Sequence, residues 1–88
     1  MHYVLVYDVS DDDTRDKIRE LLKDYGAKRI QYSAFEADLE EPTLIELLQR
    51  AERLLRGSDG ALIAIPLCSR DLEKTVTIGE EKDEESVF

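Results

Sequence analysis

Cysteine, histidine and long hydrophobic runs are scarce in this sequence, and each scarcity excludes a class of protein. With one cysteine, Cys68, the chain has no internal disulfide, and with one histidine, His2, it has no zinc cluster of thiolates and imidazoles. Any bound metal must therefore rest on oxygen ligands. The longest apolar runs, Tyr3–Tyr7 and Ala61–Leu67, are far shorter than the roughly 18 residues that span a bilayer, and no charged leader precedes the first. We expect a cytoplasmic protein with no membrane partner.

Several enzyme motifs are also missing. The sequence contains no phosphate-binding loop, no dinucleotide fingerprint and no Gly-x-Ser-x-Gly elbow. Its 88 residues suffice for one domain, and the 42% that are hydrophobic supply one modest core. We predict a single domain over residues 1–79, followed by a mobile acidic tail over residues 80–88.

Acidic residues outnumber basic ones, and the net charge at pH 7 is −9. Five acids and one lysine give the last nine residues a charge of −4. An acidic total argues against non-specific binding of polyanions, which needs Lys and Arg at the surface. Residues 14–31 are the exception, because six basic residues against three acids give them a charge of +3. Ion pairing along the helix explains most of these charges, and a nucleic-acid surface, with Phe35 just beyond it as a stacking residue, is the alternative.

The first half of the domain alternates between strand and helix patterns. The β-branched and aromatic run His2–Val9 predicts a central strand. A helix is expected from about Thr14 to Tyr25, because its apolar residues recur every three to four positions. Asp13 is the predicted N-cap, and Gly26 the left-handed residue that ends the helix.

The second half adds further strands and a second helix. Lys28–Leu39 has strand composition and is either one bent strand or a tight hairpin. A helix begins near Pro42 and stops at Gly57. Ala61–Leu67 predicts a buried strand, and Pro66 marks either its end or an edge of the sheet. Lys74–Gly79 predicts a last, short strand. This order gives an α+β, ferredoxin-like β-α-β-β-α-β unit with both helices on one face of an antiparallel sheet, and the extra strand is expected to pair with a partner chain.

Asp8 is the first candidate for chemistry, because a carboxylate at the end of an apolar strand does not serve to fill a core. Strand alternation places it on the face of Val4 and Val6, with Tyr7 on the other face. A simple strand-end acid that meets solvent is the competing interpretation. The acids Asp11–Asp13 lack the spacing of a calcium loop, so helix capping explains them better than a cation site.

Four segments, in their order and spacing, resemble the CRISPR-associated protein 2 family over about residues 2–79: YVLVYDVSDDDTRDKI, KRIQYSAFEADL, ALIAIPLC and TVTIG. The resemblance implies a ferredoxin-like homodimer and a hairpin within 28–39 that turns near Tyr32 and Ser33. It also implies that the C-terminal strand, with Thr75, Val76, Thr77 and Ile78, is exchanged across the homodimer and pairs with the partner's sheet.

The resemblance also implies an activity. Members are described as Mg²⁺-dependent endonucleases on single-stranded RNA or double-stranded DNA, with Mn²⁺ as a substitute, and as the bridge in a complex with the CRISPR integrase, CRISPR-associated protein 1. Asp8 matches the metal-binding, catalytic aspartate. The positions that match activity or substrate contact in the family are Tyr7, Arg15, Lys17, Arg29 and Phe35, and Lys17 stands where some members have a second arginine.

One carboxylate is a poor Mg²⁺ site, but a two-fold axis can bring two copies of Asp8 together. The metal site would then exist only in the dimer. The main alternative is a non-catalytic dimeric adaptor that spans DNA between integrase subunits, with Asp8 as a structural residue. A small-molecule sensor is disfavoured, because the sequence has no glycine-rich ligand loop.

Overall fold

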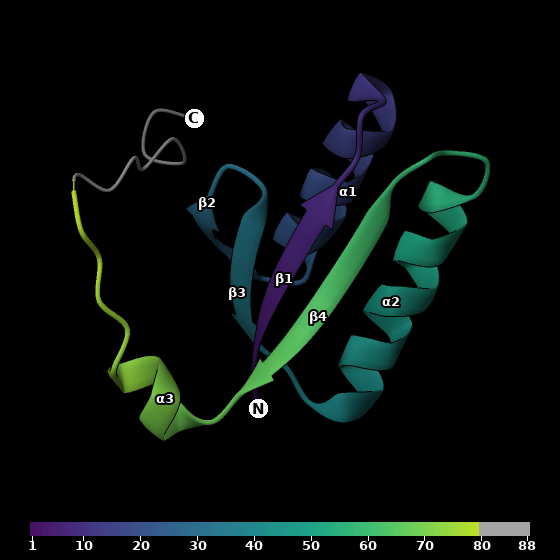
Figure 1. Ribbon diagram of the computed structural model, residues 1–88. Coiled ribbons are helices and arrows are strands. Elements are labelled where there is room, and N and C mark those ends of the chain that lie inside the picture. The colour runs from purple at the N-terminus through teal and green to yellow at the C-terminus, as the bar shows by residue number, and fades with distance from the viewer. Residues whose placement is uncertain (80–88) are drawn as a thin grey trace.

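The computed structural model describes residues 1–79, and the predicted acidic tail, 80–88, lies outside the described residues. Seven elements follow one another along the chain (Figure 1): β1 (His2–Asp8), α1 (Asp12–Asp24), β2 (Lys28–Gln31), β3 (Ala34–Asp38), α2 (Glu41–Leu55), β4 (Ala61–Leu67) and α3 (Ser69–Glu73). The segment 28–39 is therefore a hairpin, and its turn lies at Tyr32 and Ser33 as expected. Within residues 1–79, no helix has the length and apolar composition needed to cross a bilayer.

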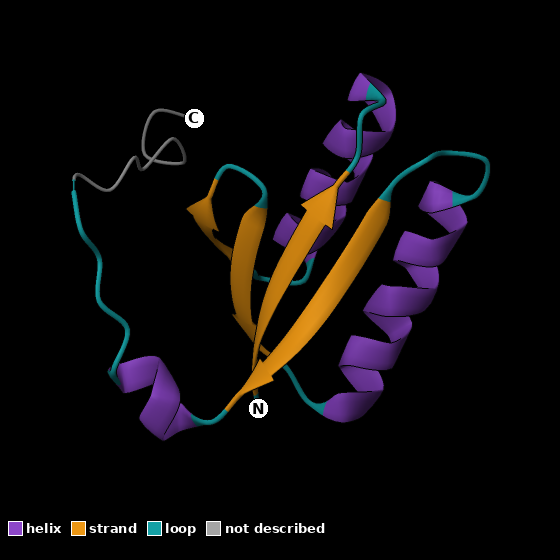
Figure 2. Ribbon diagram, viewed as in Figure 1, coloured by secondary structure: helices purple, strands orange, loops and turns teal. Residues whose placement is uncertain are grey.

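The four strands form one antiparallel sheet in the order β2-β3-β1-β4. Both long helices, α1 and α2, pack on the same face of this sheet, which leaves the other face open (Figure 2). The register places Leu5 of β1 between Phe35 of β3 and Ala64 of β4. The predicted ferredoxin-like fold is confirmed.

The core lies between the sheet and the two helices. Alternation along β1 directs Tyr3, Leu5 and Tyr7 into it, and all three are buried. Helix periodicity brings apolar side chains to meet them, and Ile18, Leu22 and Leu47 are fully buried. Each fully buried side chain of this kind contributes about 1.5–3 kcal/mol relative to an exposed one.

Helix α1 begins earlier than predicted, and its N-cap is Asp11 instead of Asp13. The Asp11 carboxylate accepts hydrogen bonds from the backbone N–H of Thr14 at 2.8 Å and from its hydroxyl at 2.7 Å. Of the three aspartates, only Asp11 is followed three residues later by a residue, Thr14, whose backbone N–H and hydroxyl can both donate to it. Asp11 therefore becomes the N-cap. The helix ends as predicted, with Gly26 in the left-handed region at φ 79°.

The predicted strand over Ala61–Leu67 is present as β4, and it lies at an edge of the sheet, as Pro66 allowed. Its expected burial is wrong for the single chain. Leu62 and Ala64 pack against the core, whereas Ile63 and Ile65 are 57% and 43% exposed on the open face. The run is apolar on both faces, so its composition does not distinguish a covered face from an uncovered one.

The segment after β4 also differs from expectation. A short helix, α3, follows β4, and Lys74–Gly79 forms no strand in this single chain. The structure places the segment clear of the sheet (Figure 1), with Val76 and Ile78 76% and 90% exposed. A β-strand needs a neighbour to satisfy its backbone groups, and this chain offers the segment none. Its exchange across a homodimer stays a prediction.

Candidate metal and nucleic-acid site

Asp8 is an exposed carboxylate at the carboxyl end of the central strand β1. Alternation places it on the open sheet face with Val4 and Val6, and its cross-strand partner on β4 is Ala61. Among residues 1–79, no three His, Cys, Asp or Glu side chains gather closely enough to hold a metal ion. One chain, over these residues, therefore offers no ready set of three protein ligands at this place.

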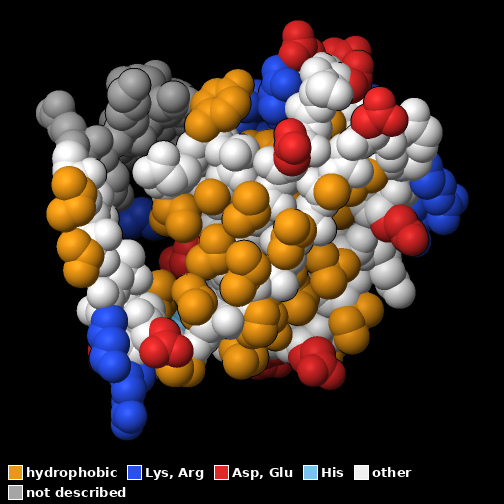
Figure 3. Space-filling model, viewed as in Figure 1, with side chains coloured by type: hydrophobic (Ala, Val, Ile, Leu, Met, Phe, Trp, Pro, Cys, Tyr) orange, Lys and Arg blue, Asp and Glu red, His pale blue; other side chains and the backbone are white. Residues whose placement is uncertain are grey.

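The open face around this carboxylate is apolar. Space-filling side chains in Figure 3 show hydrophobic groups gathered over β1 and β4, and this open face includes Val4, Val6, Ile63 and Ile65. Beside it, Nδ1 of His2 lies 2.9 Å from a carboxylate oxygen of Glu36. A contiguous exposed apolar patch with polar groups at its edge is typical of a protein interaction site.

Tyr7 lies on the opposite face of the sheet and is 2% exposed. Its hydroxyl donates a hydrogen bond to the backbone oxygen of Tyr32 at 3.3 Å. Burial raises the pKa of the Tyr7 hydroxyl, while the charges of Arg19 and Arg29 oppose that rise. In this structure the Tyr7 hydroxyl holds the backbone of the hairpin turn against the core.

Phe35, expected to stack on a base, is fully buried. Its ring packs at 6.2 Å from the ring of Tyr7, with an angle of 31° between the two planes. The ring therefore belongs to the core and presents no face to a ligand at the surface of this chain.

Three arginines gather near the Tyr7 hydroxyl and the hairpin turn. Arg15 donates to the backbone oxygen of Val9 at 3.0 Å and forms an ion pair with Asp12. This ion pair raises the pKa of Arg15, and Tyr32 adds a smaller contribution of the same sign. We name the group formed by Arg15, Arg19 and Arg29 the arginine cluster.

The other two members of the arginine cluster approach from two elements. Arg19 of α1 forms an ion pair with Asp16, and it lies close enough to the Tyr7 hydroxyl to lower the pKa of that group. Arg29 of β2 donates to the backbone oxygen of Tyr32 at 2.9 Å, and its guanidinium carbon lies 5.2 Å from the centre of the Tyr32 ring. The Tyr32 ring itself is 58% exposed.

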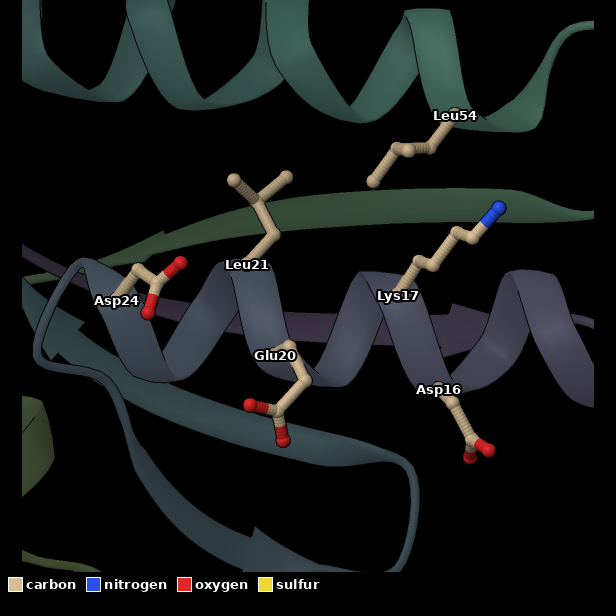
Figure 4. Close-up of a pocket in the computed structure, with 6 residues that line it drawn as sticks. All are labelled: Asp16, Lys17, Glu20, Leu21, Asp24 and Leu54. Atoms are coloured by element: carbon tan, nitrogen blue, oxygen red, sulfur yellow. The ribbon is translucent and has the colours of Figure 1, made fainter.

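Lys17, predicted with the arginines, lies elsewhere. It lines a groove between α1 and α2, where it extends toward Leu54 beside Leu21 (Figure 4). Asp16, Glu20 and Asp24 complete the lining of this groove, whose volume is about 320 Å³. Since Lys17 and Arg15 are two positions apart on a helix, they project in nearly opposite directions.

The sequence prediction of the site missed Arg19 and Tyr32. Arg19 follows Arg15 at the i,i+4 spacing that puts two side chains on one helix face, and this signal was available. For Tyr32 no such signal exists, because the sequence does not reveal which aromatic of the segment 28–39 stays exposed.

Comparison with known proteins agrees with this geometry. Residues 1–75 match the family described as CRISPR associated protein Cas2. The CRISPR-associated endoribonuclease Cas2 of Desulforudis audaxviator is 35% identical over 78 residues, which cover 89% of this chain and 74% of that protein. A CRISPR-associated endonuclease Cas1/endonuclease Cas2 fusion of Thermoproteus tenax is 31% identical over 78 residues, 89% of this chain and 30% of the fusion.

Among solved structures, a hypothetical protein from Thermus thermophilus superposes with a TM-score of 0.78 at 36% identity, over 92% of this chain and 93% of that one. Fold and site together define a small ferredoxin-like protein with one covered and one open sheet face. The chain belongs to the CRISPR-associated Cas2 family. The resemblance inferred from the sequence is thus confirmed.

Proposed function

We propose that this chain works in CRISPR adaptation as a homodimeric, Mg²⁺-dependent endonuclease on single-stranded RNA or double-stranded DNA. One observation carries the proposal: Asp8 is an exposed carboxylate at the end of the central strand, on an apolar face that the chain leaves open. The relative from Desulforudis audaxviator, named an endoribonuclease, supports the same activity.

The open face supports a homodimer. Two copies that cover each other's Ile63 and Ile65 would remove the largest exposed apolar surface of the sheet from water. The segment with Thr75, Val76, Thr77 and Ile78 is exposed and β-branched, and it would add to the partner's sheet as a further strand. Both contacts would cover surface that a single chain leaves exposed to solvent.

The donor set suits Mg²⁺ once two copies pair. Mg²⁺ takes oxygen ligands, keeps several waters and binds proteins through one or two carboxylates plus substrate phosphates. Asp8 and its counterpart in the second copy would supply these two carboxylates, and Mn²⁺ would substitute. The ion, when bound, lowers the pKa of its water and offsets negative charge on the attacked phosphate.

The arginine cluster would position the nucleic acid. Arg15 donates to the carbonyl of Val9, the residue directly after Asp8, so its guanidinium lies near the carboxyl end of β1. It is the member of the cluster best placed to hold a phosphate next to the one attacked. Asp8 itself would hold the ion, and within one chain the described residues form no group of three His, Cys, Asp or Glu side chains around it.

A non-catalytic adaptor between the CRISPR integrase and protospacer DNA is the second candidate. The Thermoproteus tenax fusion joins Cas1 and Cas2 in one chain, and this supports Cas1 as a partner. Within residues 1–79, no group of three potential metal ligands surrounds Asp8, and His2 lies at the other end of β1, which also suits a structural role.

A nuclease assay separates the two candidates. Wild type, Asp8→Asn and the control Asp13→Asn are titrated with Mg²⁺ on a short single-stranded RNA and a short DNA duplex. Asp13 is an exposed acid in the first turn of α1 and lies outside the open face, so its change should leave cleavage intact. Loss of cleavage in Asp8→Asn alone supports the endonuclease. Equal cleavage by all three proteins would overturn Asp8 as the catalytic residue, and no cleavage by wild type would favour the adaptor.

A further inference from the structure

Tyr32 is an exposed aromatic ring fixed on a rigid base. It lies in the turn between β2 and β3 and is 58% exposed. Its backbone oxygen accepts two hydrogen bonds, from the Tyr7 hydroxyl at 3.3 Å and from Arg29 at 2.9 Å. Because Tyr7 is buried in the core, its hydrogen bond connects the turn directly to the core.

One face of the ring is already occupied by a cation. The Arg29 guanidinium lies 5.2 Å from the ring centre, a distance typical of a cation–π contact. This contact limits the rotation of the ring and leaves the rest of its surface to solvent. A ring held in this way loses little freedom when a planar group stacks on it.

Two further arginines lie near the turn that carries the ring. Arg15 and Arg19 are 23% and 22% exposed and pair with Asp12 and Asp16, which are themselves 83% and 59% exposed. Exposed ion pairs of this kind contribute little to stability, so a phosphate oxygen can replace either carboxylate at low cost. The guanidinium groups also match phosphate oxygens geometrically.

We infer that Tyr32 is the stacking platform for an unpaired base, and that the arginine cluster holds the phosphates on either side of it. The inference rests on the proposed function and narrows the substrate to single-stranded nucleic acid, because a base within a duplex cannot offer its face to the ring. Tyr32 therefore takes the stacking role that the sequence suggested for Phe35, whose ring is buried.

The test uses a short single-stranded oligonucleotide that carries 2-aminopurine, whose fluorescence falls when the base stacks. Binding is measured in excess chelator, so that nothing is cut, by anisotropy and by this quenching. Tyr32→Ala and Tyr32→Leu should bind about 10-fold more weakly or worse and lose the quenching, with an unchanged salt dependence. Tyr32→Phe should behave as wild type, because it keeps the ring.

Tyr25→Ala is the matched control. Tyr25 also has a guanidinium over its ring, that of Arg50 at 5.7 Å, but its hydroxyl donates to Glu46 and it lies away from the arginine cluster. This variant should bind as wild type. Melting curves establish that each variant is folded, and Tyr32→Leu keeps apolar bulk at the turn if Tyr32→Ala unfolds.

The outcomes separate this inference from the proposed function. If wild type binds and quenches but Tyr32→Leu does so equally well, the stacking platform is overturned while the proposed function stands. If Tyr32→Ala weakens duplex binding as much as single-strand binding, stacking of an unpaired base is overturned too. If wild type binds no nucleic acid at all, the proposed function is overturned, and so is this inference, because it rests on that function.

Discussion

Replacing Ile63 and Ile65 together by threonine should shift the proposed homodimer toward monomers that keep their fold. Both side chains lie on the open face of the edge strand β4 and contribute little to the core of their own chain. Threonine keeps the β-branched shape that suits a strand and replaces part of the apolar surface by a hydroxyl. The change therefore acts on association far more than on folding.

The exposed fractions set the expected magnitude. Ile63 is 57% exposed and Ile65 is 43% exposed, so a partner would newly cover about one whole isoleucine side chain per copy. Burial of one such side chain stabilises the dimer by about 1.5–3 kcal/mol, and each of the two copies makes this contribution. Threonine retains about half of the apolar surface, which leaves a loss of about 1.5–3 kcal/mol per dimer. Dimerisation should weaken about 10- to 100-fold.

Sedimentation velocity over a range of concentrations measures this change directly. Ile45→Thr is the matched control, because Ile45 is 47% exposed on α2, away from the open face, and should leave dimerisation unchanged. Circular dichroism melting checks that the double variant is folded. A double variant that dimerises with wild-type affinity would refute the assignment of the open face as the dimer interface.

Three further changes test other parts of the structure. In sedimentation velocity, a chain that ends at residue 73 should dimerise more weakly than a chain that ends at residue 79. The chain that ends at residue 79 should also bind DNA more tightly than the full chain at low salt, because it lacks the −4 charge of the tail. Asp11→Ala should melt at a lower temperature than wild type at pH 7. The hydrogen bonds from Thr14 lower the pKa of Asp11 below its unfolded value, so this difference should vanish as the pH falls through the lowered pKa. Phe35→Ala should cost about 3–5 kcal/mol of folding stability in urea titrations, and Phe35→Leu should keep wild-type nucleic-acid binding, because the ring is buried.

The regular part of the fold follows from local patterns. The apolar periodicity of α1, its glycine stop at Gly26 and the alternation of Tyr3, Leu5 and Tyr7 along β1 each specify one structure, and the sequence contains all of them. The hairpin over 28–39 was ambiguous from composition alone, since Gln31 and Ser33 suit both a bent strand and a turn.

The remaining differences depend on tertiary contacts. The run Ala61–Leu67 is apolar on both faces, so only its place at the sheet edge shows that Ile63 and Ile65 are exposed. The helix α3 spans five residues, which is too short for a periodic pattern. By contrast, the separation of Lys17 from Arg15 could have been predicted, because residues two positions apart on a helix point in nearly opposite directions.

The central claim is a metal site made by Asp8 from two copies, and Mn²⁺ titration followed by electron paramagnetic resonance tests it most directly. Free Mn²⁺ gives a sharp signal that broadens on binding, so the number of sites per chain is obtained without any nuclease activity. The account predicts about one Mn²⁺ per two chains, displaced by Mg²⁺ and lost in both Asp8→Asn and the monomeric Ile63→Thr/Ile65→Thr variant. Undiminished binding in Asp8→Asn, or one ion per chain in the monomeric variant, would contradict it.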